Sequence, residues 1–312
     1  MNQIRGTLAL FSAAVLVTAG LSGCGDNAAT IPLQAVSERA SPSVDNLIAY
    51  AAFGGTGQLF VFSIRPDGSG NVLLTRLDAD GDIRNDGGFH PSWRPDGDAI
   101  VFGRTDAGNR DIFRMDDRGG DVTQLTTDPN SDMQPCYSAD GSKIAFVSNR
   151  FGTNDIFIMD ADGSNQTQIT SSPADDQWPC FDPTGQFIAY QSTAEEDDQV
   201  EDTDIWRVDL NTGVQTDLTD ESPDSSNQGA PSWSPDGAKM LYHDDRAGDF
   251  DIWVMDSSGA NQQQLIAEPL SEGFPVWFPD GNRFAFVRAR AVWTAASDGT
   301  DVRQVTRSAA SP

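Results

Sequence analysis

Short apolar stretches separated by turn-forming residues recur along most of the chain. The stretches AIVF, KIAF, FIAY, KMLY and RFAF are each followed by a polar loop and, in four of the five, by a second apolar stretch such as DIFIMD or DIWVMD. A turn and a short alternating segment ending in Leu-Thr or a similar pair then complete the unit. Apolar stretches of this length, bounded by Gly, Pro, Asp and Asn, are typical of strands. The pattern predicts four short strands in each unit.

The units repeat at a nearly constant spacing. Five segments have a proline as their second residue: HPSWRPDG, QPCYSADG, WPCFDPTG, APSWSPDG and FPVWFPDG. The steps between successive prolines are 44, 44, 52 and 44 residues for Pro91, Pro135, Pro179, Pro231 and Pro275. Four antiparallel strands in a repeat of this length are typical of a β-propeller blade, whose apolar faces are covered only when blades stack around an axis.

The two ends of the repeat region set the number of blades. Residues 47–75 match the last three strands of a unit, and Pro42-Ser43-Val44 is the candidate for its shortened first strand. The last unit keeps AVWTA and SDGTDVRQVT but has lost the DIW motif. We therefore predict an all-β fold, a six-bladed β-propeller of four-stranded antiparallel blades, over residues 43–312.

The N-terminal residues predict an export signal. Residues 1–23 carry one charge, Arg5, and an apolar run that is too short for the ~20 residues of a membrane-spanning helix. The quartet Leu-Ser-Gly-Cys resembles the lipobox of bacterial lipoproteins, which implies removal of residues 1–23 and acylation of Cys24. The alternative is an ordinary signal peptide with an incidental cysteine. Residues 24–42 show no periodicity, so we expect a flexible tether behind the acylated Cys24.

Charge and composition exclude several classes of function. The chain has 20 Lys and Arg against 47 Asp and Glu, a net charge of −27, which repels nucleic-acid phosphates and anionic head groups. We expect no nucleic-acid binding, and contact with a membrane through the lipid anchor only. Three cysteines and two histidines are too few for a disulfide framework or a histidine-based metal cage. No cofactor is expected.

The repeat carries a family resemblance. The segment P-x-W-S-P-D-G, followed by I-A-F and D-I-W-x-M-D-x-D-G, resembles the TolB-type propeller repeat over about residues 43–307. The resemblance implies the propeller fold and a location in the cell envelope. The residues before Ser43 are too few for the α/β domain that precedes the propeller in TolB, so we expect the propeller without that domain. Related repeats occur in peptidases of the prolyl-oligopeptidase type and in oligogalacturonate lyases, so the repeat does not select a function.

Catalytic machinery is not recognisable in the sequence. A G-x-S-x-G nucleophile elbow does not occur, and no α/β-hydrolase domain is expected after the propeller. The lyase resemblance would imply a metal held by several histidines, whereas His90 and His243 fall in different repeat units. We therefore predict a non-catalytic protein.

Several residue types recur at one position in successive units, and we expect them to serve packing. Cys136 and Cys180 share such a position; a disulfide is one possibility, but equivalent side chains point in the same rotational sense, which favours two buried thiols facing apart. Aspartates at the start of the third strand are expected to accept hydrogen bonds from turn backbone: Asp111, Asp155, Asp204 and Asp251. Aromatic residues at two positions are expected to form the core between blades: Trp93, Tyr137, Phe181, Trp233 and Trp277, and Phe113, Phe157, Trp206, Trp253 and Trp293.

Departures from the repeat are concentrated on one face of the predicted propeller. The regular turns lie on one face, and the opposite face carries the irregular loops LDADGDIRNDGGF, DESPDSSNQG and the insertion QSTAEEDDQVEDTD that makes the 52-residue step. Binding sites usually lie on such loops. Clustered acids bind a basic partner or Ca²⁺, or simply keep the surface solvated. The candidate partner-binding acids of the insertion are Glu195, Glu196, Asp197, Asp198, Glu201 and Asp202.

The residues just before each repeated proline should surround the mouth of the central channel on that same face. Through the family resemblance we expect this mouth to bind peptide segments; solvation or plugging of the channel is the alternative. The candidate ligand-binding residues are His90, Asp132, Gln134, Asp176, Trp178, Gln228, Glu272 and Phe274.

The sequence as a whole favours a monomeric, non-catalytic envelope lipoprotein that binds a protein or peptide. In a host with two membranes the flanking residues of Cys24 favour the periplasmic face of the outer membrane. The alternative function is that of a glycan-binding or lyase- or hydrolase-related propeller that acts on an extracytoplasmic polymer.

Overall fold

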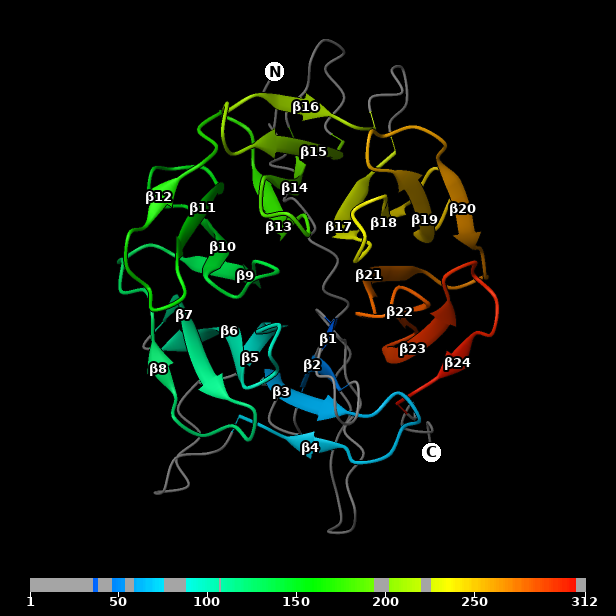
Figure 1. The fold of residues 1–312 in the computed structure, drawn as a ribbon, viewed down its shortest axis with the longest axis horizontal. Helices are drawn as coiled ribbons and strands as arrows, with labels where there is room; N and C mark the ends of the chain where they lie inside the picture. Colours follow the sequence, from blue (N-terminus) through cyan, green and yellow to red (C-terminus); the bar gives the residue numbers. More distant parts are fainter. Residues whose placement is uncertain are drawn as a thin grey trace, which may run out of the picture.

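The protein is a ring of six four-stranded antiparallel sheets (Figure 1). This computed structural model describes residues 36–38, 47–53, 59–75, 88–106, 108–193, 202–219 and 226–306. Strands are consecutive in sequence within every sheet, with the first strand at the centre of the ring and the fourth at its rim. The predicted all-β, six-bladed propeller is confirmed. Within the described ranges, no helix has the length and apolarity needed to cross a membrane.

The first three blades contain half of the strands. Blade one consists of β1 (Val36–Glu38), β2 (Ile48–Phe53), β3 (Leu59–Ile64) and β4 (Val72–Leu73). Blade two consists of β5 (Gly88–Trp93), β6 (Ala99–Asp106), β7 (Asn109–Asp116) and β8 (Thr123–Gln124). Blade three consists of β9 (Asp132–Tyr137), β10 (Lys143–Ser148), β11 (Asp155–Asp160) and β12 (Thr167–Gln168).

The remaining blades follow the same order. Blade four consists of β13 (Asp176–Phe181), β14 (Phe187–Ser192), β15 (Asp204–Asp209) and β16 (Gln215–Asp217). Blade five consists of β17 (Gln228–Trp233), β18 (Lys239–Asp244), β19 (Asp251–Asp256) and β20 (Gln263–Ile266). Blade six consists of β21 (Glu272–Trp277), β22 (Arg283–Arg288), β23 (Ala291–Ala296) and β24 (Arg303–Gln304).

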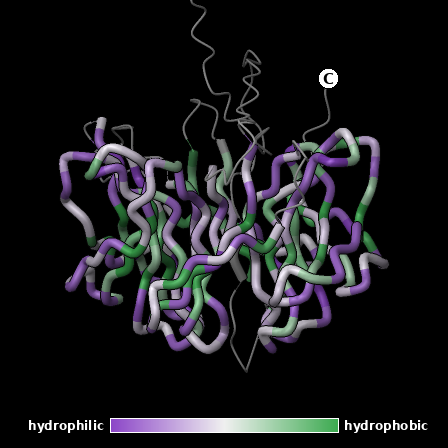
Figure 2. The backbone as a smooth tube through the Cα atoms, turned by 90° about the horizontal axis from the view of Figure 1, so that it is seen from above, coloured by the Kyte–Doolittle hydropathy of each residue, from purple (hydrophilic) through white to green (hydrophobic). Residues whose placement is uncertain are grey.

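The strands run between two faces that differ in their loops. In the side view the hydrophobic stretches lie along the strands and many of the hydrophilic ones lie towards the two faces (Figure 2). One face carries two turns of each blade, the turn between the first and second strands and the turn between the third and fourth. We call it the turn face. The opposite face, with the loops between second and third strands and the connections between blades, is the connection face. Three irregular segments that the sequence assigns to the connection face, residues 76–87, 194–201 and 220–225, lie outside the described ranges.

Turn chemistry accounts for part of the negative charge. In the first turn of blade five, the carboxylate of Asp236 accepts the N–H of Ala238 at 3.0 Å, and Gly237 closes the turn at a φ of 71°. Positive φ is the conformation in which glycine pays no steric cost. These hydrogen bonds hold the pKa of Asp236 below its usual range, with the bond from Ser234 contributing most. Acids at such turns are therefore structural.

The first strand lies upstream of its expected position. Residues 36–38 pair with β2, with Val36 opposite Tyr50 and Glu38 opposite Ile48, whereas Pro42-Ser43-Val44 was the expected strand. The regular first turns of blades two to six fix the distance between the first two strands, whereas the sequence between residues 38 and 47 contains no Pro-Asp-Gly segment. The sheet therefore begins inside the stretch that the sequence assigns to the tether. Residues 1–23 and Cys24 lie outside the described residues.

The hydrophobic core lies between adjacent blades, as the repeated aromatic residues predict. Between blades two and three, Val101 and Ile112 pack with Tyr137, Phe146 and other buried side chains. The aromatic residues that end the first strands are all buried, at 3–9% exposure: Trp93, Tyr137, Phe181, Trp233 and Trp277. In the second set, an arginine lies over the ring in four blades, at 4.5–4.9 Å: Phe113, Phe157, Trp253 and Trp293.

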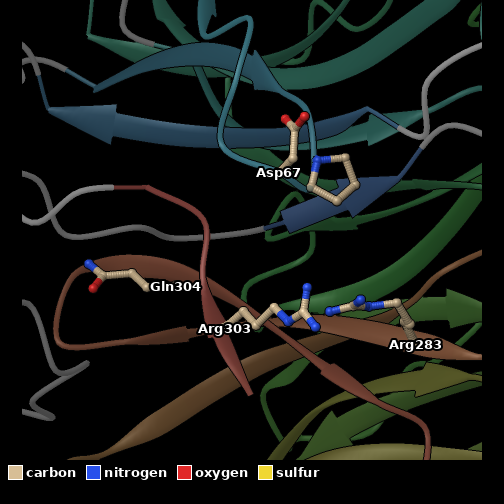
Figure 3. A pocket seen from close by; sticks show the side chains of 5 residues that line it. Asp67, Arg283, Arg303 and Gln304 are labelled. Atoms are coloured by element: carbon tan, nitrogen blue, oxygen red, sulfur yellow. The ribbon is translucent and has the colours of Figure 1, made fainter. Parts of the chain in front are cut away.

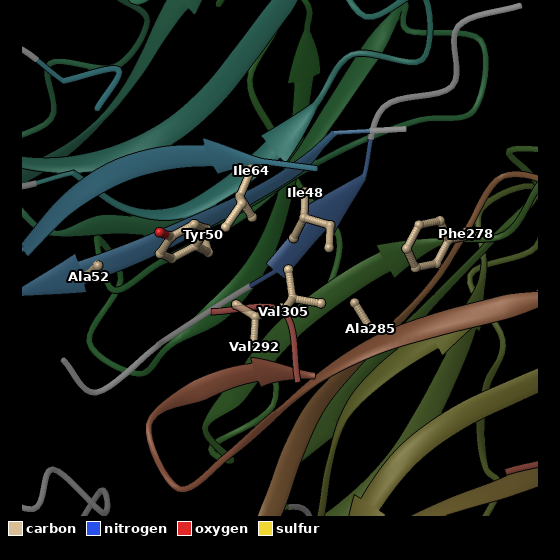
Figure 4. Packing of buried hydrophobic residues seen from close by; sticks show 8 residues of the cluster. All are labelled: Ile48, Tyr50, Ala52, Ile64, Phe278, Ala285, Val292 and Val305. Carbon is tan, nitrogen blue, oxygen red and sulfur yellow. The ribbon is translucent and has the colours of Figure 1, made fainter. Parts of the chain in front are cut away.

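The ring closes by side-chain packing between blades six and one, because every blade is built from consecutive strands. Figure 4 shows Ile48, Tyr50 and Ile64 of blade one against Val292 and Val305 of blade six. Backbone approach reinforces the contact, since a Cβ added at Gly68 would lie 2.7 Å from the carbonyl oxygen of Val305. Blade six therefore holds blade one through the same kind of contact that joins most other neighbours.

Candidate binding site at the central channel

A backbone irregularity recurs on the first strand of five blades. The residue before each repeated proline has a positive φ of 49–55°, and the register with the second strand shifts beside it. A following proline disfavours the helical regions for the preceding residue, so this conformation is strained outside glycine. The five residues are His90, Gln134, Trp178, Ala230 and Phe274.

Three of these residues carry large rings, and they come from alternating blades. His90 of blade two lies 4.6 Å from Trp178 of blade four, and Trp178 lies 4.9 Å from Phe274 of blade six, measured between ring centroids. Blades two, four and six are spread around the ring, so these contacts are made across the channel axis. The bulged strands thus bring together three side chains that the sequence separates by 184 residues.

Further rings extend the cluster. His243 on β18 lies 5.4 Å from Phe274 and 4.8 Å from Phe250, and Phe89 lies 5.2 Å from His90. Both histidines of the chain therefore meet in one cluster, although they belong to different blades. His243 was not among the predicted site residues. Its signal is a departure from the repeat, because the equivalent positions on the second strands are Gly103, Val147, Gln191 and Val287.

The cluster carries no charge at neutral pH. Burial lowers the pKa of His90 to about 3, with a smaller contribution from Arg110, and burial lowers the pKa of His243 to about 4. The backbone N–H of Phe274 donates to Nδ1 of His243 at 3.3 Å. Nδ1 of His90 is buried and has no hydrogen-bond partner among the described residues. We call His90, Trp178, His243 and Phe274 the channel cluster.

An amide fixes the position of the central ring. Gln134 is buried; its Oε1 accepts the backbone N–H of Trp178 at 2.9 Å, and its Nε2 donates to Oε1 of Gln177 at 3.4 Å. The left-handed backbone of Trp178 is thereby tied to blade three. The channel cluster is a preorganised apolar and amide surface.

The other predicted channel residues lie two positions earlier and are buried between blades. Arg150 pairs with Asp132 at 3.0 Å, and Arg288 pairs with Glu272 at 2.6 Å. Burial nevertheless raises the pKa of Glu272 to about 7. Each of these ion pairs lies within one blade and ties its first strand to the end of its second strand. All four are at most 3% exposed: Asp132, Asp176, Gln228 and Glu272.

Each of these residues faces the repeated aspartate of the preceding blade. The expectation that those aspartates accept hydrogen bonds from turn backbone is wrong for Asp111 and Asp251, to which the side chains of Gln124 and Gln264 donate at 3.1 and 2.6 Å. The donors are side chains from the fourth strand of the same blade.

The carboxyl pair between blades three and four differs from the others. Asp155 and Asp176 are 2% and 1% exposed, and each has one oxygen without a hydrogen-bond partner among the described residues. Burial raises the pKa of Asp155, and it raises the pKa of Asp176 to about 6, although Ser192 donates to Asp176 at 2.5 Å. No arginine is paired with either carboxyl in the described ranges. Asp176 is therefore half protonated near pH 6.

The acidic insertion begins and ends beside this pair. Ser192, opposite Asp176, is its second residue, and Asp204, opposite Ser192, is its last. Its ends are thus on the connection face, two strand positions from Trp178. Asp202 lies among the described residues; the predicted partner-binding acids outside them are Glu195, Glu196, Asp197, Asp198 and Glu201.

The two cysteines lie near the channel cluster. Cys136 and Cys180 are free thiols in this structure. The proximity of the two thiols lowers the pKa of Cys136 and raises that of Cys180, so the expectation that the thiols face apart is wrong, although each Sγ donates to a backbone carbonyl. The first strands of adjacent blades converge towards the axis, which brings equivalent side chains into contact. In the same position, Ser92 accepts the backbone N–H of Tyr137 at 3.1 Å.

The side chains at the channel define the chemistry that the site offers. Among the residues that the structure describes, no group of three His, Cys, Asp or Glu side chains is arranged to hold a metal ion. The channel cluster offers ring faces and two uncharged imidazoles, and Gln134 and Gln177 beside it add amide groups. Such groups bind apolar and amide-bearing partners.

Comparison with known proteins finds the same repeat elsewhere. Residues 83–228 match the family described as the TolB beta propeller domain. The chain is 31% identical over 84 residues to the uncharacterized protein Atu1656 of Agrobacterium fabrum and 32% identical over 78 residues to the uncharacterized peptidase YuxL of Bacillus subtilis. These segments are 27% and 25% of this chain, and they span only 28% and 11% of those proteins.

Solved structures share the propeller. TolB from Acinetobacter baumannii is similar with a TM-score of 0.61 at 22% identity, over 75% of this chain and 54% of that chain. An oligogalacturonate lyase in complex with manganese is similar with a TM-score of 0.58 at 13% identity, over 91% of this chain and 87% of that chain. Likeness at these identities establishes the fold alone, and a fold does not decide between binding and catalysis.

Proposed function

From the premise that the chain is a TolB-like six-bladed β-propeller, we propose that it is a non-catalytic scaffold of the cell envelope that binds a protein or peptide. The partner contacts the connection face, which carries the channel cluster and the two ends of the acidic insertion. Asp202 and the five acids before it attract a basic region of the partner, and the channel cluster takes an apolar or aromatic side chain.

The observation that carries this proposal is the channel cluster. Five strained residues before proline persist only because the surrounding structure holds them, and such strain is concentrated at functional positions. His90, Trp178 and Phe274 remain partly exposed while their rings touch across the axis. Preorganised rings bury much apolar area at little entropic cost, which is the character of a binding hot spot.

We also propose that the propeller is tethered to a membrane. Acylation of Cys24 after removal of residues 1–23 would anchor the propeller to a membrane of the envelope, where it can contact other envelope proteins. Metabolic labelling with a fatty-acid analogue tests this proposal. Label that is lost in Cys24→Ala supports it, and label that is retained contradicts it.

A second candidate function is binding of a glycan of the extracytoplasmic space. The observation that favours it is the ring of Trp178 beside the neutral His90, since indole rings stack on sugars. In this case the ligand is a saccharide and the acidic insertion plays no part.

Affinity capture from the envelope fraction of the native host distinguishes these functions. The bait is the intact protein, compared with Trp178→Ala and with charge reversal of the acids from Glu195 to Asp202. Phe151→Ala is the matched control, because Phe151 is an aromatic residue on the connection face, 70% exposed, outside the channel cluster. We expect a discrete partner that both site variants lose and Phe151→Ala retains.

Two outcomes contradict the scaffold proposal. The first is capture of the same proteins by all four baits. The second is a saccharide that binds the wild type and is lost in Trp178→Ala, with no protein partner, which favours the glycan-binding function instead.

A further inference from the structure

Blade six departs from the repeat at the strand that follows its first turn. In blades three and five the second strand opens with a lysine that faces an aspartate of the third strand: Lys143 opposite Asp160 and Lys239 opposite Asp256. The Lys143 and Asp160 side chains form an ion pair at 2.5 Å. In blade six the cation is Arg283, and the residue opposite it is Ala296. The cation is kept and its carboxylate is lost.

A second arginine lies beside the first. Arg303 opens β24, at a position that is Thr123 in blade two and Thr167 in blade three. Asp301 lies between the two arginines, 2.7 Å from Nε of Arg303 and 3.6 Å from Nη1 of Arg283. Figure 3 shows the two guanidinium groups facing each other.

The hydrogen-bonding capacity of Arg283 is not filled. Its Nη2 donates to the hydroxyl of Thr294 at 2.9 Å. Its Nε is buried and has no hydrogen-bond partner among the described residues. A guanidinium presents several donors in a planar fork that matches a carboxylate. Arg283 therefore has a free donor next to a second cation.

These arginines line a cavity at the seam where blade six meets blade one. The cavity has a volume of about 360 Å³ and is lined by Pro66, Asp67, Arg283, Arg303 and Gln304. At roughly 30 Å³ per water molecule it has room for about a dozen waters, more than a simple ion needs. It opens among the turns of blades one and six, on the turn face, so it is separate from the channel cluster.

The charges around the cavity favour a monoanion. Asp301 neutralises one of the two arginines, and the other guanidinium keeps a positive charge beside the cavity, to which Asp67 also contributes a carboxylate. Asp67 uses its carboxylate to accept the N–H of Ser69 at 2.8 Å, and Figure 3 shows that carboxylate pointing away from the guanidinium groups. The chain has a net charge of −27, so an anion can bind only where positively charged side chains are close together.

We propose that this cavity is a binding site for the carboxylate of a small organic monoacid. The carboxylate lies between Arg283 and Arg303, accepts the free Nε–H of Arg283, and shares the guanidinium of Arg303 with Asp301. The organic part of the acid fills the rest of the cavity against Pro66. The site is independent of the proposed scaffold function, because it uses neither the connection face nor the acidic insertion.

Arginine side-chain NMR on the intact protein tests the proposal directly. With 15N-labelled arginine, the Nε–H signal of Arg283 is identified by its absence in Arg283→Lys and followed during titration with acetate, lactate or inorganic phosphate, at constant ionic strength. We expect saturable shifts with acetate and lactate, with an affinity at least 10-fold lower in Arg303→Gln. We expect a several-fold higher affinity in Asp301→Asn, because the competing carboxylate is gone.

Controls separate this site from general anion binding. Lys143→Gln removes the equivalent, ion-paired cation of blade three and should leave acetate binding unchanged. Arg303 is 66% exposed on its side chain, so Arg303→Gln should remain folded, which circular dichroism verifies. The proposal is overturned by shifts that do not saturate, by an affinity that Arg303→Gln leaves unchanged, or by phosphate binding more tightly than either carboxylate.

Discussion

Closure of the propeller ring can be tested at Gly68, in the turn between β3 and β4. Gly68 has a φ of 81°, and a Cβ at this position would lie 2.7 Å from the carbonyl oxygen of Val305 in blade six. The same turn in blade four contains Gly213, which has a φ of 73° but no atom within 4 Å of an added Cβ. Gly68→Ala and Gly213→Ala therefore share the backbone cost and differ in the contact with the preceding blade.

The two substitutions differ in their predicted cost. Left-handed backbone costs an alanine about 1 kcal/mol relative to glycine, and this cost applies to both. Forcing an atom into a packed contact costs about 1–3 kcal/mol more, and this applies to Gly68→Ala alone. At about 2–4 °C per kcal/mol for a domain of this size, we expect Tm to fall by about 2–4 °C in Gly213→Ala and by about 5–15 °C in Gly68→Ala.

Thermal unfolding by circular dichroism measures both values, and hydrogen exchange locates the change. In Gly68→Ala the exchange of β2, β3 and β23 should increase first, because these strands carry the seam. Equal Tm values for the two variants, within about 1 °C, would refute the claim that the contact between Gly68 and Val305 closes the ring.

Three further predictions concern the blade interfaces and the channel. Burial raises the pKa of Asp176 from 3.8 to about 6, so the free energy of unfolding of the wild type falls as pH rises through that interval. Asp176→Asn should therefore be more stable than the wild type above pH 6, by up to about 3 kcal/mol. Urea titrations should show that this difference vanishes near pH 4. The same change at Asp132, which pairs with Arg150 at 3.0 Å, should instead destabilise the protein by about 3 kcal/mol at pH 7. Cys136→Ser should leave Tm within about 2 °C by calorimetry, because Ser92 fills the equivalent position and accepts a backbone N–H.

The repeat made the fold predictable, but the position of the first strand, β1, was not predictable because its sequence does not match the repeat. Five prolines at nearly equal steps determine blades two to six, and turn residues fix the lengths of their first hairpins. Residues 36–38 were not predicted as a strand, because the sequence before β2 lacks the Pro-Asp-Gly segment that marks the end of the first strand in most of the other units. Three residues paired through backbone hydrogen bonds leave little signal in their side chains.

The candidate site was predicted in part, for a related reason. The position before each repeated proline identified His90, Gln134, Trp178 and Phe274, and the structure places these residues at the axis. The positive φ that sends them there could not be read from the sequence, since a residue before proline is normally extended. Two positions earlier, Asp176 and its equivalents were expected at the same mouth, but they are buried. The register shift at Trp178 breaks the regular alternation that would place residues two apart on the same side.

Photocrosslinking in intact cells of the native host tests the central claim, that a protein partner docks at the channel cluster, most directly. A photoreactive phenylalanine analogue replaces His90 on the connection face or, as the control, Asp140 in an exposed turn on the turn face. The account predicts a discrete crosslinked protein from position 90 and none from position 140. Absence of any crosslinked protein at position 90, or the same product from both positions, contradicts it.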